Sequence, residues 1–175
     1  MTEQVELRPV TEDDLAVMDS LLQDPTVSGE FAWFGWHDPL RFRRAWAENR
    51  LLGESGGALM VASGADRLGF VNWRRRQTTP AGWYWEMGIA ILPPARGRGY
   101  GTQAHRLLVS YLFAHTTAHR IEAATETGNI AEQKALASAG FTREGVYRAT
   151  GWRDGAWRDG VIYSILRSDL PESAG

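Results

Sequence analysis

A glycine-rich turn between a strand pattern and a helix pattern constrains the fold of this chain more than any other feature. Residues 93–102 read PPARGRGYGT, with alternating glycines at 97, 99 and 101. A strand pattern with one continuous apolar face precedes the turn at 83–92, and an apolar stripe at helical spacing follows it, from Ala104 to Leu112. Together with a short strand pattern at 121–125, these segments predict two parallel strands joined by a right-handed helical crossover.

The rest of the chain adds antiparallel strands and further helices. Additional strands are predicted at 5–10, 58–63, 68–76, 141–148 and 157–166. Additional helices are predicted at about 11–22, 40–52 and 129–139, with a loop or broken helix at 24–39. The fold class is therefore predicted as α/β (α+β), with a mixed, mostly antiparallel central sheet of about seven strands and helices on both faces.

Capping residues mark where these helices are expected to begin and end. Thr11 followed by Asp14 fits a variant of the capping box at the start of the first helix. Gly53 and Gly140 are predicted as C-terminal caps of the helices at 40–52 and 129–139.

Composition excludes several classes of protein. The chain has no cysteine, which excludes disulfides, thiolate metal sites and cysteinyl intermediates. A net charge of -2 argues against a nucleic-acid partner, and no apolar run approaches the roughly 20 residues of a membrane span. The start of the chain lacks a secretory pattern, so we expect one cytoplasmic domain at 1–170 with a short tail at 171–175.

The glycine-rich turn is predicted to bind a pyrophosphate. Alternating glycines allow several backbone N–H groups to point one way, and the following helix adds its N-terminal amides and dipole. Arg96 and Arg98 are expected to place positive charge beside them. The alternative is a flexible turn with solvated arginines.

Two other phosphate-binding motifs, the dinucleotide-binding motif and the P-loop, fit the turn less well. Residues 99–104 satisfy G-x-G-x-x-A, as in dinucleotide-binding domains, but the preceding meander and the single further crossover are too little for such a domain. A P-loop is excluded because no Gly-Lys-Ser/Thr follows.

Arg96, Gly99 and Gly101 instead form R-x-x-G-x-G, and with this motif the chain resembles the GNAT N-acetyltransferases, which use acetyl-CoA. Further segments stand in family order: Leu7-Arg8-Pro9, Glu86-Met87-Gly88, Asn129 and Ala139-Gly140-Phe141. The Glu-x-Gly strand and the stretch from Asn129 to Phe141 are most similar to the RimJ/RimL-like subgroup, whose members acetylate protein N-termini or small amines. The resemblance covers nearly the whole chain and implies the GNAT acyl-CoA N-acyltransferase fold.

The resemblance also implies a cofactor site. The residues expected to bind CoA are Ile91, Leu92, Arg96, Gly97, Arg98, Gly99, Tyr100, Gly101, Thr102, Asn129 and Lys134. The backbone amides of 97–102 would hold the pyrophosphate, the end of the strand at 89–92 would pair with the pantetheine arm, and Asn129 would hydrogen-bond that arm. Asn129 also fits a plain N-cap with Glu132, and Lys134 also fits a solvated helix lysine. No metal is expected.

Glu86 is the predicted general base. It lies on the more polar face of its strand, a few residues before the turn, and a Glu there is expected to have a partner or a function. The alternative is a structural ion pair with Arg74 or Arg76. The usual acids of the family are absent, because Leu136 and Glu132 stand at the positions of its Tyr and Ser; Tyr111, Tyr147 and Tyr163 remain, at no motif position.

Aromatic residues are predicted to shape the acceptor pocket. The expected substrate-binding residues are Trp33, Phe34, Trp36, Trp73 and Tyr84. With Glu30, Asp38 or Glu86 nearby they would suit a cationic amine with an apolar body, although any single Trp is more often a core residue. Trp152 and Trp157 on the closing hairpin are expected on the same side.

The predicted function is acetyl transfer from acetyl-CoA to a primary amine, either a small molecule or a peptide N-terminus, by direct attack in a ternary complex. The alternative is a non-catalytic acyl-CoA-binding sensor or interaction module. No nucleic-acid or membrane partner is expected, and the chain is expected to be a monomer or a homodimer.

Overall fold

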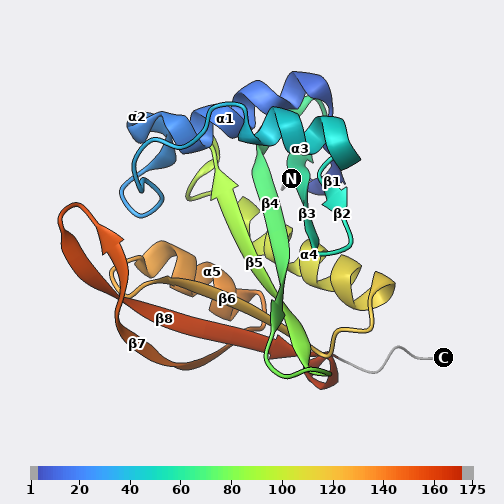
Figure 1. Ribbon diagram of the computed structural model, residues 1–175, viewed down its shortest axis with the longest axis vertical. Helices are drawn as coiled ribbons and strands as arrows, with labels where there is room; N and C mark the ends of the chain where they lie inside the picture. Colours follow the sequence, from blue (N-terminus) through green and yellow to red (C-terminus); the bar gives the residue numbers. More distant parts are fainter. Residues whose placement is uncertain (1–3, 171–175) are drawn as a thin grey trace.

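The computed structural model of the chain describes residues 4–170, and one mixed sheet organises them (Figure 1). The predicted tail at 171–175 lies outside the described residues. The strands are β1 (Glu6–Pro9), β2 (Leu52–Gly53), β3 (Gly56–Ser63), β4 (Asp66–Gln77), β5 (Trp83–Ile91), β6 (Arg120–Glu126), β7 (Thr142–Arg153) and β8 (Ala156–Leu166). Seven of them follow the order β1-β3-β4-β5-β6-β8-β7, and β2 pairs with β3. Among the strands of residues 4–170, only β5 and β6 pair in parallel, so the predicted mostly antiparallel sheet and its crossover are confirmed.

Helices cover both faces of the sheet, as predicted (Figure 1). They are η1 (Glu12–Asp14), α1 (Leu15–Gln23), α2 (Pro25–Ser28), α3 (Arg41–Asn49), η2 (Pro93–Ala95), α4 (Tyr100–His115), α5 (Ile130–Ser138) and η3 (Arg167–Asp169). One apolar core packs α4 and α5 against the sheet, around Leu108, Ile121 and Leu136. A second core packs α1 and α3 against the other face, around Met18 and Phe42. Across residues 4–170, every helix is too short or too polar to cross a bilayer.

The end of α3 differs from the prediction. The helix stops at Asn49, and Arg50 and Leu51 take left-handed conformations, with φ of 60° and 59°. Arg50 places its guanidinium 4.0 Å above the Trp46 ring. Gly53 is therefore not the cap, because it is part of β2 and pairs with Gly56 of β3.

The sheet divides between β5 and β6. These strands are in register at only two positions, Trp85 with Ile121 and Glu86 with Glu122, whereas the β4 pairing of β5 continues to Ile91. Figure 1 shows the two strands diverging beyond this point. Among the described residues, the edge of β5 at 87–91 therefore faces no strand on the β6 side, although backbone groups in a sheet normally have partners.

Asp14 fastens the first helix to the sheet. Its side chain is fully buried and accepts hydrogen bonds from Arg8 of β1 (2.6 Å) and Arg67 of β4 (2.6 Å). The backbone N–H of Thr11 also donates to it, at 2.8 Å, which completes the predicted capping box. The Arg8 guanidinium holds the pKa of the Asp14 carboxyl well below its usual range.

Asp14→Asn is expected to lower the free energy of unfolding by about 2 kcal/mol, since hydrogen bonds to a buried charge are lost. The folded-state pKa of Asp14 lies below its unfolded value of about 3.9, so its contribution is complete above about pH 5 and falls as the pH drops below about 4. Urea titrations from pH 3 to 7 check this. The exposed Asp66 gives a control, because Asp66→Asn replaces a surface carboxylate and should leave the free energy of unfolding almost unchanged. Parallel pH profiles for wild type and Asp14→Asn would contradict the assignment.

Candidate active site

The glycine-rich turn of residues 93–102, called the cofactor turn from this point, leads directly into α4. Gly97 and Gly99 have φ of 71° and 80°, and Gly99 is the N-cap of the helix. The amide of Gln103 bonds back to Gly99 at 3.2 Å, so the amides of 100–102 precede that bond and belong to the first turn. A Cβ built on Gly97, Gly99 or Gly101 would meet no atom within 4 Å. The backbone is thus open to close approach by an anion, which fits the pyrophosphate of a nucleotide cofactor.

Arg96 does not add charge to this turn in the way that the sequence suggested. Its Nε donates to the carbonyl oxygen of Ile91 at 2.8 Å. Its Nη2 donates to the carbonyl oxygens of Val27 and Ser28, the latter at 3.1 Å. Burial lowers the pKa of the Arg96 guanidinium. The side chain therefore joins the cofactor turn to β5 and α2.

The two other side chains of the turn have different surroundings. The Arg98 guanidinium lies 5.0 Å from the centroid of the Tyr100 ring. Tyr100 is only 2% exposed and its ring belongs to the core around α4. A ligand at the turn could therefore meet Tyr100 through its backbone amide, as expected for residues 97–102.

Residues expected along the cofactor arm surround the divided part of the sheet. Ile91 and Leu92 are half-buried at the end of β5, and the Leu92 amide donates to Leu68 at 2.8 Å. Asn129 acts as the N-cap of α5, accepting from the Glu132 amide at 3.3 Å and donating to Thr125 Oγ1 at 2.9 Å. The capping interpretation of Asn129 is thus observed. Lys134 is exposed on α5, one turn further along.

Glu86 lies at the last register pair before β5 and β6 separate. Its side chain is 25% exposed. Oε1 accepts from Arg74 Nε at 3.1 Å, and Oε2 pairs with Arg76 Nε at 2.7 Å. The ion pair that was the alternative for Glu86 is therefore present, and its role as a base stays a prediction.

Polar groups extend from Glu86 across the same sheet face. Glu122 is its register partner on β6 and is 8% exposed. Burial raises the pKa of the Tyr84 phenol, and a hydrogen bond to Glu122 raises it further. The Arg120 guanidinium lowers the pKa of Glu144 to about 2. Tyr84 therefore shares the face of Glu86, as predicted, but within a connected network of charges.

The aromatic segment at 29–40, called the acceptor loop from this point, reaches across the divided sheet. A Cβ on Gly128, between β6 and α5, would lie 3.4 Å from the Phe31 ring. The guanidinium of Arg153, on β7, lies 5.5 Å from the centroid of that ring. Arg153 is itself held by Glu126 of β6, with Nη2 to Oε2 at 2.9 Å. Phe31 therefore connects the loop that follows α2 to the β6–β8 side.

The other aromatic residues of the acceptor loop lie near its surface. Trp33 and Trp36 pack edge to face with centroids 5.3 Å apart. Phe34 is 58% exposed and Trp36 is 78% exposed. Both are thus accessible to a ligand, as their predicted role requires.

Trp73 lies on the wrong face of the sheet for its predicted role. It is 8% exposed in the core beneath α4, where its ring contacts Tyr111 at a centroid distance of 5.9 Å. Successive residues of a strand point to opposite faces, and Arg74 reaches Glu86 on the acceptor side. Trp73 is therefore a core residue.

Asn72 is a polar residue of the site that sequence reasoning missed. It pairs with Gly88 of β5, two positions from Glu86 and hence on its face. A Cβ on Gly88 would lie 2.7 Å from Asn72 Oδ1, so the missing side chain lets this amide approach β5. The signal was present in the sequence, as a polar residue within the apolar run 68–73 opposite a glycine.

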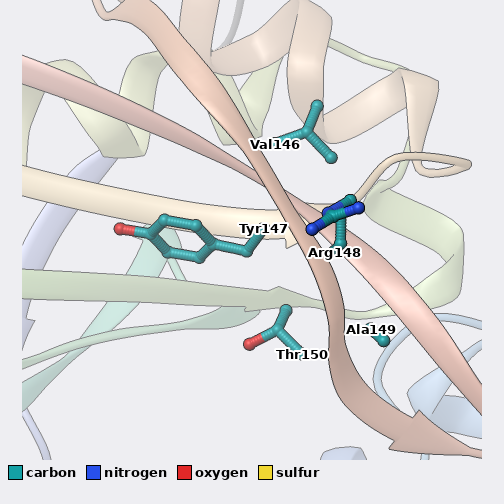
Figure 2. A pocket seen from close by; sticks show the side chains of 5 residues that line it. All are labelled: Val146, Tyr147, Arg148, Ala149 and Thr150. Atoms are coloured by element: carbon teal, nitrogen blue, oxygen red, sulfur yellow. The ribbon is translucent and has the colours of Figure 1, made fainter.

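The three tyrosines considered as acids lie in different places. Tyr111 is on α4 beside Trp73, and the buried Tyr163 donates to Gln133 of α5 at 3.4 Å. Tyr147 is 49% exposed and lines an open hollow of about 710 Å³ formed by residues 146–150 of β7. Figure 2 shows Tyr147 and Thr150 pointing to one side and Val146 to the other. None is placed beside Glu86 by a contact in the described residues.

The two positions where the family carries its acid are also occupied differently. Leu136 is fully buried. Glu132 pairs with Nε2 of His105 at 2.8 Å, and His105 is fully buried between α4 and α5. Within residues 4–170, no three His, Asp or Glu side chains group as a metal site would require.

Comparison with known proteins links most of the chain to one family. Residues 4–142 match the family described as acetyltransferase (GNAT) domain. The chain is 38% identical over 73 residues to the probable N-acetyltransferase YjcK of Bacillus subtilis, which is 42% of this chain and 40% of that protein. The chain thus aligns with about two fifths of the length of that relative.

Solved structures share the fold at lower identity. A spermidine N-acetyltransferase from Vibrio cholerae, in complex with CoA and spermine, has a TM-score of 0.79 at 18% identity, covering 95% of this chain and 97% of that one. RimJ from Mycobacterium smegmatis, in complex with CoA-disulfide, has a TM-score of 0.76 at 23% identity, covering 97% and 85%. At these identities the likeness shows the fold alone.

Proposed function

The chain belongs to the GNAT acetyltransferase domain family, and we propose that it transfers the acetyl group of acetyl-CoA to a primary amine. The predicted family and fold are confirmed by the match to residues 4–142 and by the solved structures. One observation carries the proposal: the edge of β5 loses its β6 neighbour beside the open cofactor turn. An extended ligand that enters there can bind backbone groups along its length.

The proposed cofactor site uses backbone more than side chains. The amides of 97–102 bind the pyrophosphate, with Arg98 beside them, and residues 87–92 of β5 and its end take the pantetheine arm as a further strand. Asn129, the N-cap of α5, and Lys134, in the middle of that helix, lie on the opposite side of the division. Arg96 contributes by holding the turn in place rather than by contacting phosphate.

The proposed chemistry is direct attack of the amine in a ternary complex. Acetyl-CoA supplies a thioester, and the absence of cysteine removes an acyl-enzyme route through a thiol. The amine nitrogen attacks the thioester carbonyl, and Glu86 accepts its proton, directly or through water, at the point where β5 and β6 separate. The carbon–sulfur bond then breaks, the acetyl group stays on the amine, and the CoA thiolate leaves and takes a proton from water. Its two arginine partners hold the carboxylate in a fixed orientation on the acceptor face.

The proposed acceptor is a cationic amine, in a small molecule or at a protein N-terminus. Phe34 and Trp36 offer exposed aromatic surface, and an ammonium group is attracted to aromatic faces. The spermidine N-acetyltransferase and RimJ share this fold, which is consistent with either kind of acceptor.

The proposal predicts that acetyl-CoA stabilises the protein and that an amine triggers release of free thiol. Calorimetry with acetyl-CoA, CoA and NAD measures binding, and a thiol assay with polyamines, amino acids and short peptides measures turnover. At 100 times its dissociation constant a ligand adds about 2.7 kcal/mol to the free energy of unfolding. Binding without turnover on any amine would favour an acyl-CoA sensor instead. Stabilisation by NAD alone would contradict the cofactor assignment.

A further inference from the structure

We propose that Arg96 is a positioning residue that couples the cofactor turn to the acceptor loop, so that CoA at the turn fixes the conformation of residues 29–40. The inference rests on the proposed function, because it concerns the same cofactor and acceptor sites. It assigns Arg96 a task other than phosphate binding.

The contacts of Arg96 join its own turn and the neighbouring end of β5 to α2, which is distant in sequence. Its guanidinium bonds to the carbonyl of Ile91, at the end of β5, and to those of Val27 and Ser28, the last two residues of α2. Arg96 also immediately precedes Gly97, the first left-handed residue of the cofactor turn. A restraint on the turn is therefore transmitted to the end of α2 through one side chain.

Gly29 begins the acceptor loop beside the same guanidinium. Its φ is 87°, and a Cβ on it would lie 2.9 Å from Arg96 Nη1. Both the backbone conformation and the close approach thus favour glycine at this position. The loop then continues to Phe31, which packs on Gly128 and under Arg153. The path from the cofactor turn to the far side of the divided sheet is continuous.

Through this coupling, CoA and the amine share the free-energy cost of ordering the acceptor loop. When CoA restrains the cofactor turn, Arg96 holds the α2 carbonyls and the loop is already ordered before the amine arrives. Without Arg96, the amine alone must order the loop. Loss of the contact should therefore weaken acceptor binding more than it changes CoA binding.

Hydrogen exchange with CoA alone tests the coupling without turnover. In the wild type, saturating CoA should slow exchange in both the cofactor turn and the acceptor loop. In Arg96→Lys, which keeps the charge but cannot span the same carbonyls, CoA should protect the turn and no longer the loop. In Arg98→Ala, more CoA should be needed for saturation, after which the loop should be protected as in the wild type.

Two glycine variants give a matched pair if Arg96→Lys is poorly folded. Gly29→Ala crowds the guanidinium, whereas Gly35→Ala also places a side chain at a positive φ in the same loop, 94°, but meets no atom within 4 Å. In Gly29→Ala, CoA should no longer slow hydrogen exchange in the acceptor loop, whereas in Gly35→Ala it should still do so. Equal behaviour of the two alanine variants would overturn the role of Arg96.

Steady-state kinetics give an independent reading. With saturating acetyl-CoA, Arg96→Lys should raise the acceptor KM about tenfold, whereas kcat and the KM for acetyl-CoA, which the turn also influences, should change by no more than about threefold. A purely structural arginine would instead change all three together. If CoA protects the turn but not the loop in the wild type, the coupling is wrong and the proposed function stands. If CoA protects neither, both fail.

Discussion

Glu86→Gln is expected to lower kcat about 100-fold at neutral pH and to leave the affinity for CoA unchanged. Glutamine keeps the size and one acceptor oxygen of the side chain but cannot take a proton from the amine. A protonated amine cannot attack, so the variant must use the small neutral fraction, which shrinks as the pH falls. The deficit should therefore be greatest at low pH. A pH profile of kcat and a CoA titration check both parts.

Glu144→Gln is the matched control for this experiment. Glu144 also pairs with an arginine on the same sheet face, but it lies on β7, beyond β6 and β8 from β5. Its replacement removes an ion pair without changing Glu86 or its two arginine partners, so kcat should stay near the wild-type value. Arg76→Gln separates the role of Glu86 as a base from its role in the ion pair, because this variant removes one arginine partner and keeps the Glu86 carboxylate. If Glu86→Gln gives the wild-type rate at every pH, Glu86 is only a structural partner of Arg74 and Arg76.

Gly99→Ala is expected to weaken CoA binding about 100-fold while lowering the free energy of unfolding by only about 1 kcal/mol. The stability cost comes from a left-handed residue with a side chain, since φ is 80° and the new methyl meets no protein atom within 4 Å. The affinity cost comes from a methyl group where the pyrophosphate approaches the amides. Calorimetry and urea unfolding measure the two effects.

Gly64→Ala provides the comparison for the backbone penalty. Gly64 lies in the turn between β3 and β4, with φ of 57° and likewise no atom within 4 Å. The two variants should lose similar stability, and only Gly99→Ala should lose affinity for CoA. An equal affinity for both variants would show that the cofactor turn is not the pyrophosphate site.

Local sequence signals predicted the part of the fold that matters most for the site. The strand at 83–92, the glycine turn and the stripe from Ala104 appear as β5, the cofactor turn and α4. Each depends on neighbouring residues: alternation, left-handed glycines and helical spacing. The family motif then identified the same segment.

Contacts between distant segments could not be predicted in the same way. The donors of Arg96 bond to carbonyls nearly 70 residues away, at Val27 and Ser28, and no local pattern records that approach. Trp73 was assigned to the acceptor side as an aromatic residue, although the pairing of Arg74 with Glu86 places it on the other face. The sequence allowed both a structural and a functional interpretation for Asn129 and for Glu86. The structural contact is present in each case: Asn129 caps α5, and Glu86 pairs with Arg76.

The division of the sheet between β5 and β6 also separates the first part of the sequence from the last. Strands β1 to β5 come entirely from residues before 92, and β6 to β8 come from residues after 119, so each half of the sheet is formed by its own stretch of chain. Backbone bonding joins the halves at two register pairs, and the core beneath α4 and α5 and the contacts of Phe31 join them further. A cofactor lying in the division would therefore contact both stretches of chain, and the two halves of the sheet would then be joined through the ligand as well as through their own contacts.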